Sequence, residues 1–185
     1  MFKRITVFIL IAMCTVASAF AETDVSLEEI TDDRVTGFIE KYTEGTPLDE
    51  YVEIVDIVDG IFFEYDDENE YYTAYILYSD GNMAILEFLT YQINMYYLEQ
   101  ITIPVGMKAK ALEIMNECQS RDYNSALGTV VLDDGIIGAR HIILSDGVSD
   151  YGEWAYWNFI NFEAYSINTI DEVLMRLGLK TTRIW

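Results

Sequence analysis

Asp-Gly pairs divide the middle of this chain into short runs of β-branched and aromatic residues. Three such pairs, at positions 59–60, 80–81 and 134–135, separate these runs. An Asp-Gly pair is typical of the tight two-residue turns of β-hairpins, because both residues tolerate a positive φ angle. The flanking runs are short and rich in Ile, Val, Phe and Tyr, which favours strands. The sequence therefore predicts β-hairpins at these three positions and an antiparallel sheet at the centre of the fold.

The first two turns belong to a predicted β-meander of about four strands. The acidic sequence Asp66-Asp67-Glu68-Asn69-Glu70 joins its second strand to its third as a polar loop. The strands of the meander are expected at residues 51–58, 61–65, 71–78 and 83–91.

Apolar residues recur at helical spacing in three further segments. The first helix begins either at Ser26, where Glu29 completes a capping box, or later, at Thr31 or Asp32. The last helix ends before Gly178. The three segments are residues 26–43, 107–121 and 168–177.

Residues 154–162 fit either a strand or a helix. Their aromatic content favours a strand, whereas Asp150 and Glu153 have the spacing that caps a helix. A second hairpin, residues 127–144, lies before this stretch, and no Pro-rich or Gly/Ser-rich linker interrupts the chain. These features predict a single α+β domain over residues 22–185. In it an antiparallel β-meander is followed by a helix, a β-hairpin and a C-terminal helix, with the helices packed on a twisted antiparallel sheet.

Residues 1–21 have the three parts of a secretory signal peptide. Two basic residues precede an apolar run, and small residues allow cleavage after Ala19 or Ala21. We therefore expect an exported protein, periplasmic or secreted; the alternative is an uncleaved N-terminal anchor. No other apolar run approaches the roughly 20 residues that a spanning helix needs, so no membrane span is expected after signal removal.

Acidic side chains outnumber basic ones 32 to 11, for a formal net charge of −21. Such a charge argues against binding to nucleic acid or to an anionic membrane surface. Residues 22–70 hold 18 of the acidic side chains and only two basic ones. This acidic third of the chain either keeps the exported protein soluble or docks a basic partner.

Few residues suited to catalysis or metal binding are present. His141 lies in a predicted strand, and no pattern nearby supplies a nucleophile or an orienting carboxylate. Cys118 is the only thiol left after signal removal, so no intramolecular disulfide can form. Zinc favours sets of Cys and His, and residues 66–70 lack the spacing of an EF-hand loop, which leaves only weak cation binding open there. We expect no cofactor, no metal site and no enzymatic activity, with a hydrolase using two carboxylates as the remaining enzymatic alternative.

Tyrosine is concentrated in the strand predicted at residues 71–78. Because side chains alternate between the two faces of a sheet, Tyr72 and Tyr78 share one face while Tyr71 and Tyr75 share the other. Tyr pairs a large apolar area with a hydroxyl group, which suits cores and interfaces alike.

Trp154 and Trp157 are the first candidates for a partner-binding patch. They lie in an aromatic stretch near the second predicted hairpin. Packing in the core is the simpler interpretation of such residues, whereas an exposed aromatic patch would mark a surface that contacts a partner.

Residues 110–148 resemble part of the YbjN family, whose fold is similar to that of the type III secretion chaperones. Asn116 closes a helical stretch and matches the first Asn of the family's motif, while Gln119 replaces the second. The Asp-Asp-Gly turn that follows, and the order helix, sheet, helix, sheet, helix over residues 30–180, also match. The resemblance implies an α+β domain that acts as a non-catalytic protein-binding or regulatory module. Export is an atypical feature for that family.

Two functions follow from these observations. The first is an exported module that binds another protein, with an aromatic patch supplying affinity and the acidic face selecting a basic partner. The alternative is a module that stacks a sugar or a cationic small molecule on aromatic rings beside carboxylates. A concave pocket lined by Trp154 or Trp157 would favour the alternative.

Overall fold

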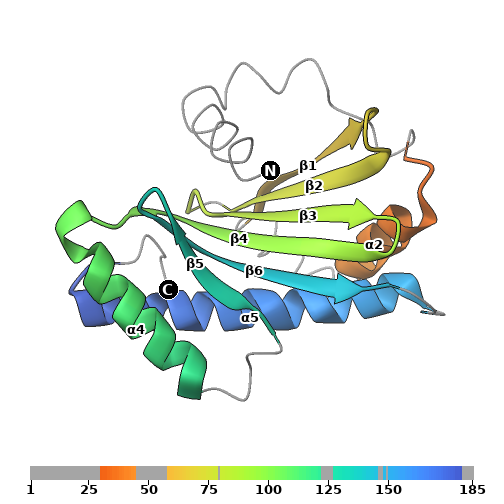
Figure 1. Ribbon diagram of the computed structural model, residues 1–185. Coiled ribbons are helices and arrows are strands. Elements are labelled where there is room, and N and C mark those ends of the chain that lie inside the picture. The colour runs from red at the N-terminus through yellow and green to blue at the C-terminus, as the bar shows by residue number, and fades with distance from the viewer. Residues whose placement is uncertain are drawn as a thin grey trace.

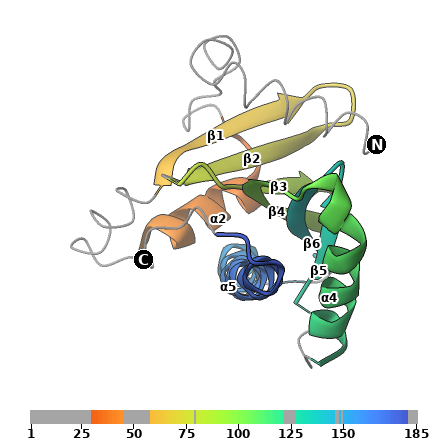
Figure 2. The same cartoon turned by 90° about the vertical axis from the view of Figure 1, so that its left-hand side faces the viewer.

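The computed structural model describes residues 30–44, 58–78, 80–121, 127–145, 148 and 150–180. Within them the chain forms a six-stranded antiparallel sheet with three α-helices on one of its faces (Figures 1 and 2). The strand order is β1-β2-β3-β4-β6-β5. The strands are β1 (Val58–Asp66), β2 (Tyr71–Tyr78), β3 (Met83–Leu89), β4 (Gln92–Thr102), β5 (Thr129–Asp133) and β6 (Ile136–Leu144). The helices are α2 (Asp33–Glu44), α4 (Lys108–Arg121) and α5 (Tyr151–Leu177), and the short 3₁₀ turn η2 (Val105–Met107) precedes α4.

This architecture confirms the predicted α+β fold. Strands β1 to β4 form the meander, α4 follows, β5 and β6 form the second hairpin, and α5 is the C-terminal helix. The turns at residues 80–81 and 134–135 lie where the Asp-Gly pairs place them, with positive φ angles at Gly81, Asp134 and Gly135.

The described helices include none that is long and apolar enough to cross a membrane. The predicted signal peptide, residues 1–21, and its cleavage after Ala19 or Ala21 lie outside the described residues.

The hairpin predicted at residues 59–60 is wrong, because β1 continues through this pair. Val58 pairs with Tyr78 and Gly60 pairs with Leu77, so β1 carries one extra residue at this point. The result is a β-bulge, and Gly accommodates the local change of direction that a bulge requires. Most of the strand expected before the pair lies outside the described residues.

Strand β4 is the longest of the described strands, and the sequence pattern does not predict it. The turn at residues 90–91, between β3 and β4, contains neither Gly nor Asn, and the buried side chains of Asn94 and Glu99 interrupt the apolar alternation of the strand. β4 pairs with β3 on one side and with β6 on the other. It therefore joins the meander and the second hairpin into one sheet.

Residues 154–162 are helical and belong to α5, which continues without a break from Tyr151 to Leu177. The expected cap is present, since the carboxylate of Asp150 accepts a hydrogen bond from the backbone N–H of Glu153. The helix ends at Gly178, which has a φ angle of 72°. The helix predicted at the C-terminus is thus only the last part of a 27-residue helix.

The hydrophobic core lies between the sheet and the helices, with α5 at its centre. Figure 2 views α5 end-on and shows it on the same side of the sheet as α2 and α4. Phe38 of α2 contacts Phe88 of β3 and Phe159 of α5, with ring centroids 5.8 and 5.7 Å apart. All three side chains are buried, so they link the two helices to the sheet through apolar contact.

Helices α2 and α5 meet where two glycines face each other. A Cβ atom added at Gly152 would lie 2.4 Å from the backbone oxygen of Gly37, whereas a Cβ atom added at Gly37 would lie 3.3 Å from the Cα of Gly152. The close approach of the two backbones therefore requires glycine at position 152 much more than at position 37.

We expect Gly152→Ala to lower the free energy of unfolding by about 2 kcal/mol, because the added methyl group meets a backbone carbonyl that cannot move aside. Gly37→Ala is the matched control, since it adds the same group to the same contact with more room. Urea unfolding of the two variants measures the difference, and equal losses would contradict this account of the helix crossing.

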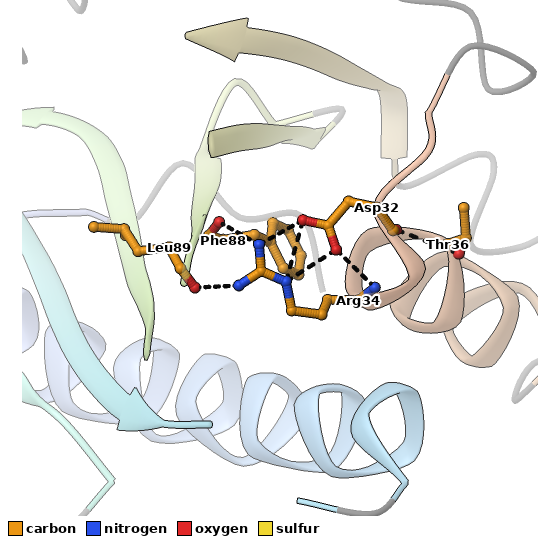
Figure 3. Close-up of polar contacts among 5 residues, drawn as sticks. All are labelled: Asp32, Arg34, Thr36, Phe88 and Leu89. Carbon is orange, nitrogen blue, oxygen red and sulfur yellow. Dashed lines mark hydrogen bonds and ion pairs between the residues drawn. The ribbon is translucent and has the colours of Figure 1, made fainter. Parts of the chain in front are cut away.

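Arg34 connects the start of α2 to the end of β3 (Figure 3). Its guanidinium donates hydrogen bonds to Asp32, from Nε to Oδ1 at 2.9 Å and from Nη2 to Oδ2 at 2.5 Å. It also donates to the backbone carbonyls of Leu89 and Phe88. Partial burial by itself would raise the pKa of Asp32, but the hydrogen bonds and charge of Arg34 outweigh it and hold this pKa below its usual value. A single side chain thus fixes α2 against the edge of the core.

We expect Arg34→Met to destabilise the fold by about 2 kcal/mol, since the variant leaves a partly buried carboxylate and two backbone carbonyls without their hydrogen-bond donor. Lys110→Met, which breaks the exposed pair with Glu113, should cost less than about 0.5 kcal/mol. Thermal or urea unfolding of both variants at neutral pH compares them directly. If Arg34→Met lost no more free energy of unfolding than Lys110→Met, the hydrogen bonds of Arg34 would not stabilise the fold.

Candidate functional site

The sheet has one face against the helices and a second face that no described helix covers, here called the outer face (Figure 2). In β2, Ala74 and Ile76 are fully buried on the helix side, so Thr73 and Tyr75 lie on the outer face. The strand pairings extend this assignment to the neighbouring strands. The outer face includes Glu64, Thr73, Tyr75, Ile85, Glu87, Gln92, Asn94, Tyr96, Arg140, Ile142 and Leu144.

Six of these side chains form two rows that cross the strands. The middle residue of each row is buried and the two flanking residues are partly exposed. Neighbouring strands lie about 4.8 Å apart, so the backbones of the two flanking residues in each row are about 10 Å apart. The rows are Glu64–Thr73–Glu87 on β1, β2 and β3, and Tyr75–Ile85–Tyr96 on β2, β3 and β4.

Each of the two tyrosines donates a hydrogen bond to a glutamate on the preceding strand. Tyr75 Oη donates to Glu64 Oε2 at 2.9 Å, and Tyr96 Oη donates to Glu87 Oε2 at 3.3 Å. Asn94 Nδ2 adds a second donor to Glu87 Oε2 at 2.8 Å. The hairpins β1–β2 and β3–β4 therefore carry the same tyrosine–glutamate pair.

Burial and the nearby carboxylates keep both phenols protonated. Burial raises the pKa of Tyr75, and the negative charge of Glu64 raises it further. Burial and Glu87 likewise raise the pKa of Tyr96, although the positive charge of Arg140 acts in the opposite direction. Both tyrosines are therefore neutral hydrogen-bond donors at ordinary pH, and each orients a carboxylate.

An apolar margin borders this polar area on β6. Ile142 is 54% exposed and Leu144 is 70% exposed. They pair across the sheet with Asn94 and Gln92, whose side-chain amides are hydrogen-bonded to each other. The outer face thus has two exposed aliphatic side chains beside its polar residues.

Trp154 and Trp157 lie on α5 and not on the outer face. Trp154 is partly buried, with its ring 5.5 Å from that of Tyr151. Trp157 is 53% exposed, with its ring 5.2 Å from that of Tyr156. Of the two predicted binding residues, Trp157 thus presents the larger surface, on the helical side of the molecule.

His141 and Cys118 both occupy positions that packing explains. His141 points toward the helices, where its ring stacks on Phe162 with centroids 6.0 Å apart, and burial lowers its pKa. Cys118 is 2% exposed, and burial raises the pKa of its thiol, which favours the unreactive protonated form.

Asn116 and Gln119, the two residues of α4 that were compared with the YbjN motif, differ in their surroundings. Asn116 is exposed to solvent. Gln119 Nε2 donates a hydrogen bond to the backbone oxygen of Val130 at 3.0 Å, which attaches α4 to the edge strand β5. Gln119, which departs from the family's motif, therefore contributes to the fold.

The acidic loop at residues 66–70 is organised by its own first carboxylate. Asp66 Oδ1 accepts hydrogen bonds from the backbone N–H groups of Glu68 and Asn69, and Oδ2 accepts one from the side chain of Asn69. Among the residues that the structure describes, no group of three or more His, Cys, Asp or Glu could hold a metal ion.

A third tyrosine–carboxylate pair lies on the opposite, helix-facing side. Tyr78 of β2 donates a hydrogen bond to Glu163 of α5. Burial, together with the charge of Glu163, raises the pKa of Tyr78 and also that of Tyr42. This pair links α5 to the sheet; Tyr78 is buried and Glu163 is partly exposed.

Known proteins offer no relative from which a function could be transferred. No protein-family model, no curated protein sequence and no solved structure matches this chain significantly. The resemblance of residues 110–148 to the YbjN family therefore stays a hypothesis, and the candidate site rests on geometry.

Sequence reasoning located part of the outer face. The alternation in β2 correctly separated Tyr75 from Tyr72 and Tyr78. It missed the glutamate partners, because the pairs join residues on different strands and depend on the register. The similar tripeptides Thr73-Ala74-Tyr75 and Asn94-Met95-Tyr96 are the only local signal of the repeated pair.

His141 makes the stability of the fold depend on pH. Its pKa in the folded state lies below the usual value of 6.5, so the unfolded chain binds more protons as the pH falls below that value. The native protein should therefore lose stability from about pH 6.5 down to the folded pKa. His141→Phe keeps the stacking on Phe162 and removes this dependence. Urea unfolding of both proteins at pH 8 and pH 5.5 isolates the contribution of His141, because the carboxylates contribute equally to both proteins. If the two proteins lost the same free energy of unfolding between these pH values, the prediction would be wrong.

Proposed function

We propose that the protein is a non-catalytic module that binds another protein through the outer face of its sheet. The observation that carries this proposal is the repeated tyrosine–glutamate pair on a sheet face that no described helix covers. Such a surface combines aromatic area, oriented acceptors and an apolar margin, which together suit recognition of a polypeptide.

Charge indicates the kind of partner. Glu64 and Glu87 form no ion pair with a basic residue among those described. The acidic loop at residues 66–70 adjoins the same hairpin, and the chain as a whole carries a formal charge of −21. A partner with exposed lysine or arginine side chains would be attracted to this region and would pair with its carboxylates.

The expected export and the order of elements are compatible with this function. The order helix, four strands, helix, two strands, helix agrees with what the resemblance to the YbjN family implies. A binding module that acts by contact needs neither a cofactor nor a nucleophile. We propose that the protein acts in the periplasm or outside the cell, as expected from residues 1–21.

Trp157 on α5 marks the alternative contact surface, since it is 53% exposed and no charged residue lies between Glu153 and Glu163 in the helix. The alternative function, stacking of a sugar or a cationic small molecule, would use the same tyrosines or Trp157. Binding experiments must therefore test the two surfaces separately.

The test is crosslinking capture of envelope proteins by the purified protein, at low and high salt. We expect one partner to be captured at low salt and lost at high salt, because salt screens the carboxylates. The double variant Glu64→Gln, Glu87→Gln should capture several times less of that partner.

Two controls give the test its specificity. Glu113→Gln with Asp134→Asn removes the same charge from exposed positions away from the outer face and should leave capture unchanged. Trp157→Ala should also leave it unchanged. Loss of capture in Trp157→Ala alone would move the contact to α5, and equal capture by every variant would refute both surfaces.

A further inference from the structure

We propose that the outer face contains two like subsites, Tyr75–Glu64 and Tyr96–Glu87, and that each takes one basic side chain of a single extended segment of the partner. This inference rests on the proposed function and specifies the ligand. It predicts a segment that presents two lysine or arginine side chains about 10 Å apart.

The repetition of geometry carries the inference. Glu64 pairs across the sheet with Thr73, and Tyr75 stands two residues beyond it. Glu87 pairs with Asn94, and Tyr96 again stands two residues beyond. The second subsite is therefore the first one displaced by two strands, which places the two carboxylates in one row across the sheet.

Each subsite has the components that bind a cation. In each subsite one carboxylate oxygen accepts the hydrogen bond of the tyrosine, at 2.9 Å for Glu64 and 3.3 Å for Glu87. A ring beside each carboxylate adds a face that attracts ammonium and guanidinium groups. Charge-assisted hydrogen bonds to a carboxylate are stronger than neutral ones.

The charged neighbours limit where the segment lies. Arg140 on β6 pairs with Tyr96 and places a positive charge at that border of the second subsite. Asp66 and the loop that follows it add acidic groups at the end of the β1–β2 hairpin. A basic segment should therefore cross β1, β2 and β3 and keep away from β6.

The spacing selects a backbone conformation. In polyproline II, residues i and i+3 face the same side and lie about 9.3 Å apart. In a β-strand, same-side residues lie about 6.7 or 13 Å apart, which fits the two subsites less well. A Lys-Pro-Pro-Lys sequence is thus the simplest probe of the two subsites.

The experiment measures binding of fluorescent peptides to the full protein by anisotropy. The probes contain Lys-Pro-Pro-Lys, or the same sequence with either lysine replaced by Gln. We expect the two-lysine peptide to bind about fivefold more tightly than either one-lysine peptide. Glu64→Gln and Glu87→Gln should each lower the affinity for the two-lysine peptide by about fivefold relative to the wild-type protein. Each variant should also bind the two-lysine peptide and a one-lysine peptide with the same affinity.

The outcomes separate this inference from the proposed function. If the wild-type protein binds one-lysine and two-lysine peptides equally while the double variant Glu64→Gln, Glu87→Gln weakens both, the outer face binds cations but the two-subsite inference is wrong. If the double variant binds every peptide as the wild type does, or no peptide binds, the inference fails, and capture of the protein partner decides the proposed function. Unfolding midpoints of the variants show that they remain folded under the conditions of the assay.

Discussion

The burial of one sheet face by α5 is the constraint on which the rest of the structure depends. An antiparallel sheet with an apolar face must cover that face, and here a single 27-residue helix supplies most of the cover. Helices α2 and α4 then pack against α5 on the same side, with Phe38 between Phe88 and Phe159 at one end of the core. The close contact of Gly37 with Gly152 allows α2 to approach α5. All described helices therefore lie on one side of the sheet.

The outer face is the consequence of this one-sided arrangement. Its side chains have to remain compatible with water while they pack closely enough to support the strands beneath. The tyrosine–glutamate pairs satisfy both requirements, because the rings pack along the sheet and each hydroxyl group is hydrogen-bonded to a carboxylate. The same pairs place two carboxylates in one row across the sheet, where they can accept hydrogen bonds from basic side chains.

Polar side chains have different tasks on the two sides of the sheet. On the helix side, Arg34, Tyr78 and Gln119 make partly buried hydrogen bonds that hold helices to strands. On the outer face the polar groups bond mainly to one another across neighbouring strands. The polar groups of the outer face are therefore not needed to attach a helix to the sheet, whereas the pair of Tyr78 and Glu163 joins β2 to α5.

The sequence alone determined the features that local chemistry controls: the α+β class, the turns at residues 80–81 and 134–135, the cap at Asp150 and the alternation of tyrosines in β2. Only the tertiary structure decided the features that depend on pairing between distant segments. Residues 59–60 form a bulge because β2 fixes the register of β1. Residues 154–162 are helical, and this conformation buries Phe159 against α2 and Phe162 against β6. Strand β4 is held by β3 and β6 despite polar residues that obscure its pattern. The tyrosine–glutamate pairs likewise exist only in the register of the folded sheet, since each joins residues on two different strands, and a one-residue shift would put the partners on opposite faces.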